Sequence, residues 1–334
     1  MTHGGDIFAI AAARGWDWRE VADFSASINP LGPAPGVQTA ICKAIHRIRH
    51  YPEREPKRLR EALSKKWNVD PDSILLGNGA TELIFFLARM FGGRAITLAA
   101  PVFSEFHRAF PRAHVAKLSK PETWLTEQAL VVTRPANPTG ISTGISALRE
   151  RLEQSGEPLI IDESFLEFSG LPSASTLLAR FPQLIVLRSL TKFYALPGLR
   201  LGALVTDASL IAEWRRYREP WQVNVLAEEA ALAALADDVH SSATIDFVRE
   251  QREFLMGQIE AIAGATPHPS DANFICVSLQ HRAQDLVDYL LEGKILIRNC
   301  ANWPGLPGEA VRIAVRTPDE NERLLRAWRA FRCA

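Results

Sequence analysis

The chain has 334 residues, 47% of them hydrophobic, which suits one large buried core and a second, smaller lobe. Its 38 Lys and Arg residues balance 38 Asp and Glu residues, so net charge gives no reason to expect nucleic acid or an anionic membrane as a partner. The four cysteines lack Cys-x-x-Cys spacing and suit reduced thiols better than a disulfide frame or a zinc site.

Individual stretches of the sequence also bear on membrane and DNA-binding classes of protein. The first residues carry no basic segment followed by an apolar one, and no later stretch reaches transmembrane length, so we expect a cytoplasmic protein. The most basic stretch, residues 43–66, also contains acidic residues. Because no DNA-reading motif accompanies it, we interpret this stretch as a solvated helical face.

Residues 74–91 predict a strand, a glycine turn and a helix. Gly77 and Gly79 permit the tight turn, and Thr81 lies where an apolar helical run begins. Backbone N–H groups at such a helix start, together with the positive end of the helix dipole, form a site for a phosphate dianion. Glycine-rich turns before helices are common, so this pattern is not specific by itself.

Four further apolar runs, at residues 95–100, 130–132, 159–161 and 184–187, predict buried strands. The second is followed by a turn in which Pro135 and Pro138 restrict the backbone around Asn137. The third ends in Asp162, a carboxylate whose burial is costly without a cationic partner. An alternative role for Asp162 is that of a helix N-cap.

The fourth of these strands leads into the most informative stretch, residues 188–202. Ser189 and Thr191 are followed by Lys192, and Arg200 lies in the same segment. Hydroxyl groups and a second cation can hold a phosphate while a nearby amine reacts. A lysine close to another cation and partly out of water loses affinity for its proton and becomes nucleophilic.

The C-terminal third predicts a helix rich in Ala and Leu after residue 224, and helical periodicity through residues 247–262. Strands are predicted at residues 272–277, 295–298 and 311–316, and an amphipathic helix from Pro318. Arg298 and Arg312 lie on these apolar strands. Each could be a surface arginine, but a buried arginine needs an anion, and two of them suit a substrate with two anionic groups.

Together these motifs resemble those of the fold-type I enzymes that use pyridoxal 5′-phosphate (PLP), in the branch of histidinol-phosphate aminotransferases and threonine-phosphate decarboxylases. The resemblance implies an α/β fold with a large domain, whose mostly parallel central sheet lies between helices, and a smaller α+β domain. The implied parts are an N-terminal arm at residues 1–28, a large PLP-binding domain at residues 29–238 and a small domain at residues 239–334. It also implies a homodimer with shared active sites.

The same resemblance assigns roles to the candidate residues. Lys192 would form the Schiff base with PLP, and Asp162 would pair with the pyridine nitrogen and keep it protonated; these are the two catalytic residues. Phe103 would stack on the ring, and Asn137 would donate its amide to the phenolic oxygen. The residues implied to hold the cofactor phosphate are Gly79, Ala80, Thr81, Ser189, Thr191 and Arg200, with Tyr51 reaching the cofactor phosphate of the partner subunit.

Substrate binding is implied for the N-terminal His3-Gly4-Gly5 segment, for Asn137 and for the two arginines. Adjacent glycines beside a histidine can bring backbone N–H groups and an imidazole to an anion, although a frayed terminus is the alternative interpretation. Family position gives Arg312 the α-carboxylate and Arg298 the phosphate, with the division between them left open.

Phe165 is a departure from the aminotransferase pattern. Aminotransferases of this fold usually have a Tyr there, whose hydroxyl bonds the phenolic oxygen of the cofactor, and Phe makes no such bond. Together with the His-Gly-Gly segment and Trp221, Phe165 favours decarboxylation of L-threonine O-3-phosphate to (R)-1-amino-2-propanol O-2-phosphate for cobalamin biosynthesis. The alternatives are a histidinol-phosphate aminotransferase and a PLP-fold protein that only binds ligand.

Overall fold

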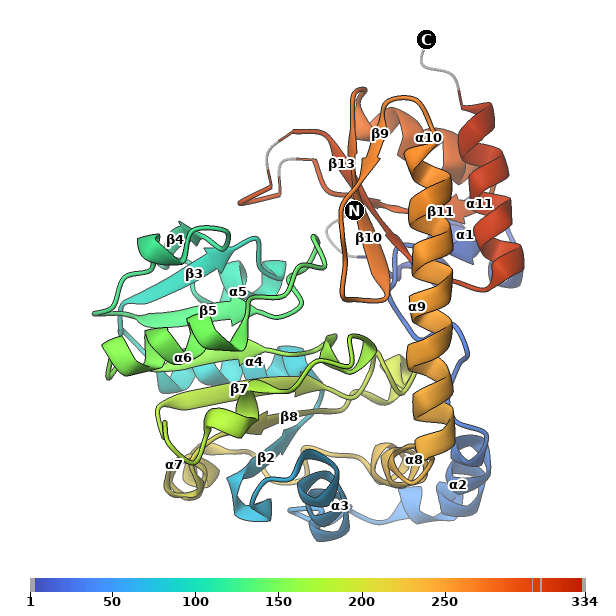
Figure 1. Ribbon diagram of the computed structural model, residues 1–334. Coiled ribbons are helices and arrows are strands. Elements are labelled where there is room, and N and C mark those ends of the chain that lie inside the picture. The colour runs from blue at the N-terminus through green and yellow to red at the C-terminus, as the bar shows by residue number, and fades with distance from the viewer. Residues whose placement is uncertain (1–3, 302, 307, 332–334) are drawn as a thin grey trace.

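Two lobes, each built around its own β-sheet, make up the computed structural model of this chain, which describes residues 4–301, 303–306 and 308–331 (Figure 1). In the part of the chain described, the larger lobe has a seven-stranded sheet. Its strands, in spatial order, are β2 (Ile74–Gly77), β8 (Gly202–Val205), β7 (Leu184–Ser189), β6 (Leu159–Asp162), β5 (Ala129–Thr133), β3 (Ile96–Ala100) and β4 (His114–Lys117).

The central strands of this sheet are parallel, and β8 runs antiparallel to both of its neighbours. Thr133, Asp162 and Leu187 are register partners, so β5, β6 and β7 end at one edge of the sheet. In open α/β sheets, ligands bind outside the carboxyl ends of the strands. The predicted α/β class with a mostly parallel central sheet is confirmed.

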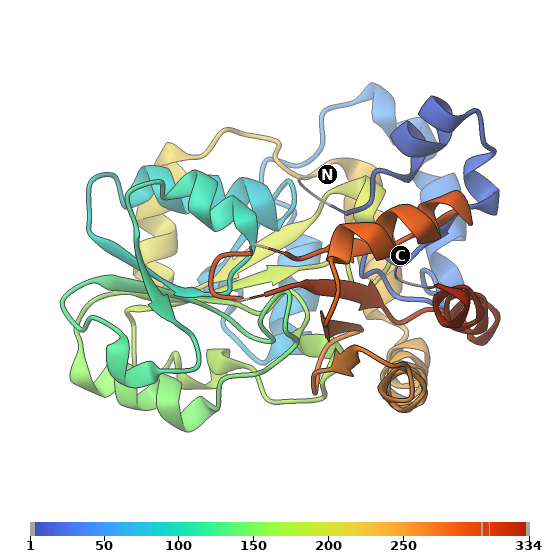
Figure 2. The ribbon, with the colours of Figure 1, turned by 90° about the horizontal axis from the view of Figure 1, so that it is seen from above.

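Helices cover both faces of the large sheet, which explains why its central strands are buried along their whole length. Leu130 and Ile161 point into one apolar cluster, and Val131 and Ile160 point into another. Figure 2 shows helices on opposite faces of this sheet. The helices of this lobe are α2 (Gly36–Ala44), α3 (Lys57–Trp67), α4 (Ala80–Met90), α5 (Ser104–Ala109), α6 (Ile145–Gln154), α7 (Ala208–Trp214) and α8 (Val225–Leu235).

The smaller lobe has an antiparallel sheet in the order β12 (Arg298–Asn299), β13 (Ala310–Ala314), β10 (Phe274–Leu279) and β9 (Ala265–Pro267). The long helix α9 (Asp238–Glu260) runs from the large lobe along the small one, which also carries α10 (Ala283–Glu292) and α11 (Pro318–Ala330) (Figure 1).

The N-terminal segment joins the C-terminal lobe. Its helix α1 (Ile7–Arg14) is followed by β1 (Ala22–Asp23), which pairs in parallel with β11 (Ile295–Leu296). Phe24 belongs to the apolar cluster of the small lobe, and its carbonyl accepts a hydrogen bond from the N–H of Ala314 at 2.9 Å. The division of the chain at residues 28 and 238 stays a prediction.

The elements differ from the sequence expectations in several places. Strands β4, β8 and β9 were not predicted, and the strand expected at residues 295–298 is divided between β11 and β12. Helix α9 begins at Asp238, well before the apolar periodicity starts, because the side chain of Asp237 caps it by accepting from the N–H of His240 at 2.8 Å. Among the described residues, no helix has the length and apolar character required to cross a membrane.

Candidate active site

A cavity of about 440 Å³ lies between the two lobes at the carboxyl edge of the large sheet, and it brings together most of the predicted residues. Its walls come from the ends of β5, β6 and β7, from the start of α4 and from the small-lobe strands. The predicted residues that line it are Gly4, Ala80, Thr81, Phe103, Asn137, Asp162, Ser189, Thr191, Lys192, Arg200, Arg298 and Arg312.

Lys192 follows β7 and points into this cavity. Its pKa is lowered to about 8, mainly by withdrawal of the ammonium group from solvent and further by the positive charges of Arg312 and Arg200. A larger share of the amine is therefore neutral near pH 7–8 than for an exposed lysine. A neutral amine is the form that can attack a carbonyl carbon.

Asp162 is buried at the end of β6. Its Oδ1 atom accepts hydrogen bonds from the backbone N–H of Ser164 at 2.9 Å and from the Ser164 hydroxyl at 2.5 Å. Burial nevertheless raises the pKa of Asp162 to about 6. Since the next short helix has Phe165 as its N-cap, the alternative role of Asp162 as a helix cap is wrong.

The start of α4 forms a cradle for an anion. Its N-cap, Gly79, has φ +86°, and a Cβ atom there would lie 2.5 Å from Nη2 of Arg200. The guanidinium group is thus packed against the start of the helix. Ala80 and Thr81 line the cavity there, and the first N–H groups of a helix have no partner within the helix.

Strand β8 packs closely against the start of α4. A Cβ atom on Gly202, at the start of β8, would lie 2.5 Å from the backbone nitrogen of Ala80. Across the cradle, the hydroxyl groups of Ser189 and Thr191 are hydrogen-bonded to each other at 2.8 Å. Two hydroxyls, a helix N-terminus and a guanidinium group therefore converge, which is the donor set that a phosphate dianion requires.

Arg312 is a buried cation that contacts Asn137, one of the predicted cofactor residues. Its Nη1 donates to Oδ1 of Asn137 at 2.7 Å, and its Nη2 donates to the carbonyl oxygen of Ser25 at 2.6 Å. The oxygen of the Asn137 amide is thereby engaged, which leaves its nitrogen as the group that can donate to a ligand. The guanidinium carbon also lies 5.2 Å from the centre of the Phe274 ring.

Arg298 is the register partner of Arg312 across β12 and β13, so both side chains leave the same face of the small sheet toward the cavity. Burial lowers the pKa of each guanidinium group, but arginine keeps its charge at neutral pH.

Two aromatic residues complete the walls. Phe103 precedes α5 as its N-cap residue and lines the cavity. Phe165 also lines it and packs edge to face against Phe274, with ring centres 5.0 Å apart and planes at 85°. Phe165 is therefore fixed by packing, and it presents carbon atoms where a tyrosine would present a hydroxyl.

Three predicted residues lie outside the cavity walls, and one lies outside the described residues. Gly5 is exposed and donates its N–H to Oγ of Ser25 at 3.0 Å, while Gly79 flanks the cradle from the helix cap. Tyr51 is 80% exposed and stacks on Trp221 with ring centres 4.6 Å apart. The prediction for His3 falls on a residue outside the described part of the chain.

Several cavity residues were not predicted: Ser25, Ala26, Ser27, Ile84, Glu105, Arg108, Thr133, Ser164 and Trp303. Some had a usable signal. Thr133 ends a predicted strand, and Ser164 follows Asp162 at the spacing of an Asx turn. Glu105 and Arg108 are spaced as an i,i+3 pair on a helix, with Nη1 of the arginine 2.8 Å from the carboxylate. Trp303 had no local signal.

Within the described chain, three buried polar atoms of this cavity have no hydrogen-bond partner: Oγ1 of Thr133, Oγ of Ser27 and Nε of Arg312. Asp162 forms no ion pair with any described side chain, although it is buried. Buried polar groups without partners are costly. A ligand with a protonated ring nitrogen and a phosphate, which describes PLP, would give a cationic partner to Asp162 and an anion to the start of α4.

Beneath the cavity, a row of buried charges ties the same strands together. The backbone ladder continues past the strand ends, with the N–H of Arg134 bonded to Asp162 and that of Glu163 bonded to Leu187, both at 2.8 Å. Nη1 of Arg134 lies 3.1 Å from the Glu163 carboxylate, and Nη1 of Arg188 lies 3.7 Å from it. The next side chain on each strand thus points away from the cavity into an ion-pair row.

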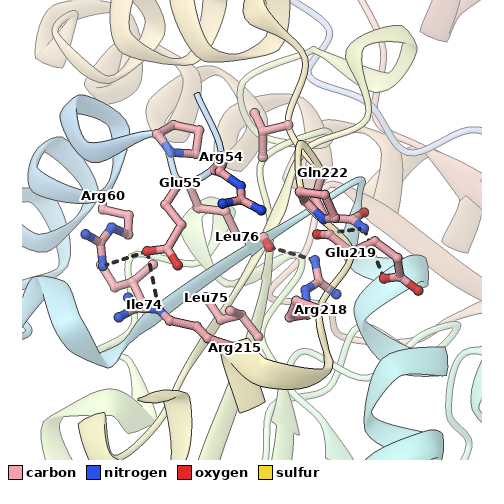
Figure 3. A pocket seen from close by; sticks show the side chains of 13 residues that line it. Arg54, Glu55, Arg60, Ile74, Leu75, Leu76, Arg215, Arg218, Glu219 and Gln222 are labelled. Atoms are coloured by element: carbon pink, nitrogen blue, oxygen red, sulfur yellow. Dashed lines mark hydrogen bonds and ion pairs between the residues drawn. The ribbon is translucent and has the colours of Figure 1, made fainter. Parts of the chain in front are cut away.

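A second cavity, of about 250 Å³, lies beside β2 and the segment 215–223 (Figure 3). Its arginines face acidic groups: Glu55 lies 3.4 Å from Nε of Arg215 and 3.8 Å from Nη1 of Arg60. Arg218 donates to the carbonyl oxygen of Leu76 at 3.0 Å. None of the predicted residues is among the described residues that line this cavity, whereas most of them line the larger of the two.

A seven-stranded α/β sheet with a lysine, a buried carboxylate and a phosphate cradle at its carboxyl edge defines a PLP-dependent enzyme of fold type I. The family model for aminotransferase class I and II matches residues 19–327, and the chain belongs to this family. Its cofactor is PLP.

Individual relatives divide between two activities. The chain is 35% identical to a threonine-phosphate decarboxylase of Salmonella typhimurium, over 98% of this chain and 95% of the relative. It is 31% identical to a histidinol-phosphate aminotransferase of Symbiobacterium thermophilum, over 90% of this chain and 88% of the relative. The crystal structure of L-threonine-O-3-phosphate decarboxylase from Porphyromonas gingivalis matches with a TM-score of 0.85 and 25% identity, covering 92% of this chain and 98% of that one.

Proposed function

We propose that this protein decarboxylates L-threonine O-3-phosphate to (R)-1-amino-2-propanol O-2-phosphate, as a step of cobalamin biosynthesis. The observation that carries the proposal is the pair Arg298 and Arg312, two buried guanidinium groups that enter one cavity with Lys192. A substrate with a carboxylate and a phosphate gives each of them an anion. The 35% identical relative adds support.

Bound PLP supplies an electron-accepting ring that stabilises the negative charge left at Cα when one of its bonds breaks. Lys192 is the residue that would hold the cofactor aldehyde carbon, and its lowered pKa favours the neutral amine needed for that bond. Asp162 would hold a proton on the ring nitrogen, because a buried carboxylate stabilises a cation beside it. Asn137 would orient the ring through its amide nitrogen.

Arg312 is the residue that would select the bond to be broken. Asn137 and Ser25 hold two of its nitrogens, which leaves Nε as the donor without a described partner. A substrate carboxylate bound there would be fixed relative to the rest of the site. Lys192 would then return a proton to Cα after carbon dioxide has left. Phe165 adds no hydroxyl beside the ring, in keeping with the decarboxylase reading.

The second candidate is a histidinol-phosphate aminotransferase, which the 31% identical relative supports. In that reaction Lys192 would carry a proton from Cα to the cofactor. Histidinol phosphate has a phosphate but no carboxylate, so Arg312 would meet a carboxylate only in the half-reaction with 2-oxoglutarate. A protein that only binds ligand is disfavoured because Lys192, Asp162 and Arg200 share one cavity.

The deciding experiment measures carbon dioxide released from L-threonine O-3-phosphate by the purified protein with PLP. A parallel assay follows amino transfer from histidinol phosphate to 2-oxoglutarate. We expect gas release that Arg312→Gln removes. Amino transfer without gas release would reject the decarboxylase, and the absence of any spectral response to either phosphate would favour the protein that only binds ligand.

We also propose a homodimer in which Tyr51 reaches the cofactor phosphate of the partner subunit. Tyr51 is exposed and does not line the cavity of its own chain, and it stacks on Trp221. The variants Lys192→Ala and Tyr51→Ala would then damage different halves of one site. Mixing them should restore about a quarter of the wild-type rate, since half of the dimers are hybrids with one intact site each. No recovery after mixing and refolding would contradict shared sites.

A further inference from the structure

Trp303 lies in the loop that joins β12 to β13, and this loop reaches across to the large lobe. The loop is turned back on itself, with the N–H of Trp303 bonded to the carbonyl of Cys300 at 3.2 Å and the N–H of Leu306 bonded to that of Trp303 at 2.9 Å. The indole Nε1–H donates to the backbone carbonyl of Val102 at 3.1 Å. Val102 directly precedes Phe103, the aromatic wall of the cavity.

A second contact holds the same loop against the large lobe. Gly305 has φ +83°, and a Cβ atom there would lie 2.7 Å from the carbonyl carbon of Ala100. A side chain at this position would push the loop away from the backbone at the end of β3. The loop is therefore seated on residues 100–102 by a close backbone approach and by one indole hydrogen bond.

The face of the indole ring is turned to Arg298. The guanidinium carbon lies 5.5 Å from the centre of the Trp303 ring, within the range of a cation–π interaction. Both residues line the active-site cavity, and both also line the adjoining groove at its outer side. The ring thus lies between the cation and the large lobe at the edge of the cavity.

From these contacts we infer that Trp303 is a positioning residue for the phosphate end of the substrate. Its ring holds the guanidinium group of Arg298 in the cavity, and its N–H fixes the ring to the backbone beside Phe103. Phosphate binding and the placement of the small lobe are coupled through one side chain. The inference rests on the proposed role of Arg298 as the phosphate ligand, and it applies to threonine phosphate and histidinol phosphate alike.

A purely structural role is the competing explanation, because Trp303 also packs against the buried cluster of Cys276, Cys300 and Ala310. Two variants separate the roles. Trp303→Phe keeps an aromatic face and removes the N–H donor, whereas Trp303→Leu keeps apolar bulk and removes the face. The matched control is Trp328→Phe, the same substitution at a tryptophan buried in the core of the small lobe.

The probe is inorganic phosphate added to the PLP-loaded enzyme, so that the cradle of α4 is filled by the cofactor. Calorimetry gives the Kd, and steady-state kinetics give KM and kcat for L-threonine O-3-phosphate. We expect Trp303→Leu to raise the phosphate Kd and the KM by about 3- to 30-fold while kcat changes by less than about threefold. The phosphate Kd and the KM of Trp303→Phe should lie between those of Trp303→Leu and the wild type. Trp328→Phe should lower thermal stability and leave the phosphate Kd unchanged.

The outcomes distinguish this inference from the proposed function. An unchanged Kd in Trp303→Leu, or a rise that Trp328→Phe reproduces, would overturn the positioning role even if carbon dioxide is released. A wild-type enzyme that binds no phosphate would overturn it as well. Binding that depends on Trp303 in a protein that releases no carbon dioxide would reject the decarboxylase and retain the inference.

Discussion

Asp162→Asn should stabilise the cofactor-free protein at neutral pH although it disables the active site. The carboxylate is buried and has no ion-pair partner among the described side chains, so its charge is a cost to the empty fold. Asparagine has nearly the same shape, and its oxygen can accept the same two hydrogen bonds from Ser164. The cost of the charge is removed while the contacts remain.

The size of the effect follows from the pKa. Burial raises the pKa of Asp162 from 3.8 to about 6, and each unit corresponds to about 1.4 kcal/mol, so the gain reaches roughly 3 kcal/mol at pH 7. The folded protein binds the proton on Asp162 more tightly than the unfolded chain does, so the contribution of this group to stability falls as pH rises. The wild type therefore has its full stability from this group below pH 3.8 and loses it as pH rises through about 6.

The assay is urea unfolding of the cofactor-free protein between pH 5 and pH 8, followed by tryptophan fluorescence. The control is Asp207→Asn. In this chain Ser209 donates its N–H to Oδ1 of Asp207 at 2.9 Å in the same kind of local turn, but Asp207 is only partly buried. Hydrogen bonds from Ser209 lower the pKa of Asp207, so its contribution is present at neutral pH and is lost on acidification. At pH 7, Asp162→Asn should raise the free energy of unfolding and Asp207→Asn should lower it.

A wild type more stable than Asp162→Asn at pH 7 would refute the reasoning. The reasoning would also be refuted if the difference in free energy of unfolding between Asp162→Asn and the wild type did not become smaller from pH 7 to pH 5. Either result would mean that the empty site already satisfies the carboxylate. The case for a cationic ring nitrogen as its partner would then fail.

Two further predictions concern the supports of the site. Glu163→Ala should lower the free energy of unfolding by about 3–5 kcal/mol, because it leaves the buried Arg134 without its carboxylate, whereas Arg188 keeps Glu167 at 2.8 Å. Glu153→Ala, in an exposed pair, should cost at most about 1 kcal/mol in the same denaturant titration, and equal losses would contradict the buried row. Gly79→Ala should weaken PLP binding at least about tenfold in a fluorescence titration, since its Cβ would displace a guanidinium group and its φ is +86°. Gly198→Ala, with open space around the added Cβ, should bind PLP normally, and matching affinities for the two variants would argue against the cradle.

The parts of the site predicted from sequence are those set by local order along the chain. An apolar run that ends in a polar residue places that residue at the carboxyl edge of a parallel sheet, and this located Asp162, Asn137 and Lys192. The glycine turn likewise predicted the start of α4 beside the cavity, because a helix start depends on a few adjacent residues; its role in binding an anion stays a prediction.

The parts that were not predicted depend on contacts between distant residues. Trp303 and Val102 are 201 positions apart, and Arg312 and Asn137 are 175 apart. No spacing rule relates them, since their meeting depends on how the small lobe packs on the large one. Strand β8 was missed for a similar reason. Its apolar run is short and follows the lysine segment, and its partner β2 is far away in the sequence.

The choice between the two candidate reactions is concentrated at Arg312. The lysine, the carboxylate and the phosphate cradle serve any reaction of this family, but Arg312 joins the N-terminal segment at Ser25, the loop at Asn137 and the strand β13 in one set of hydrogen bonds. A buried guanidinium group held this firmly does not withdraw from a substrate that lacks a carboxylate. Under the proposed function, the carboxylate of a phosphorylated amino acid would neutralise the charge of Arg312 and fix the orientation of the substrate, which histidinol phosphate by itself would not do. Under the proposed function, the contacts that would direct the loss of carbon dioxide would also disfavour histidinol phosphate.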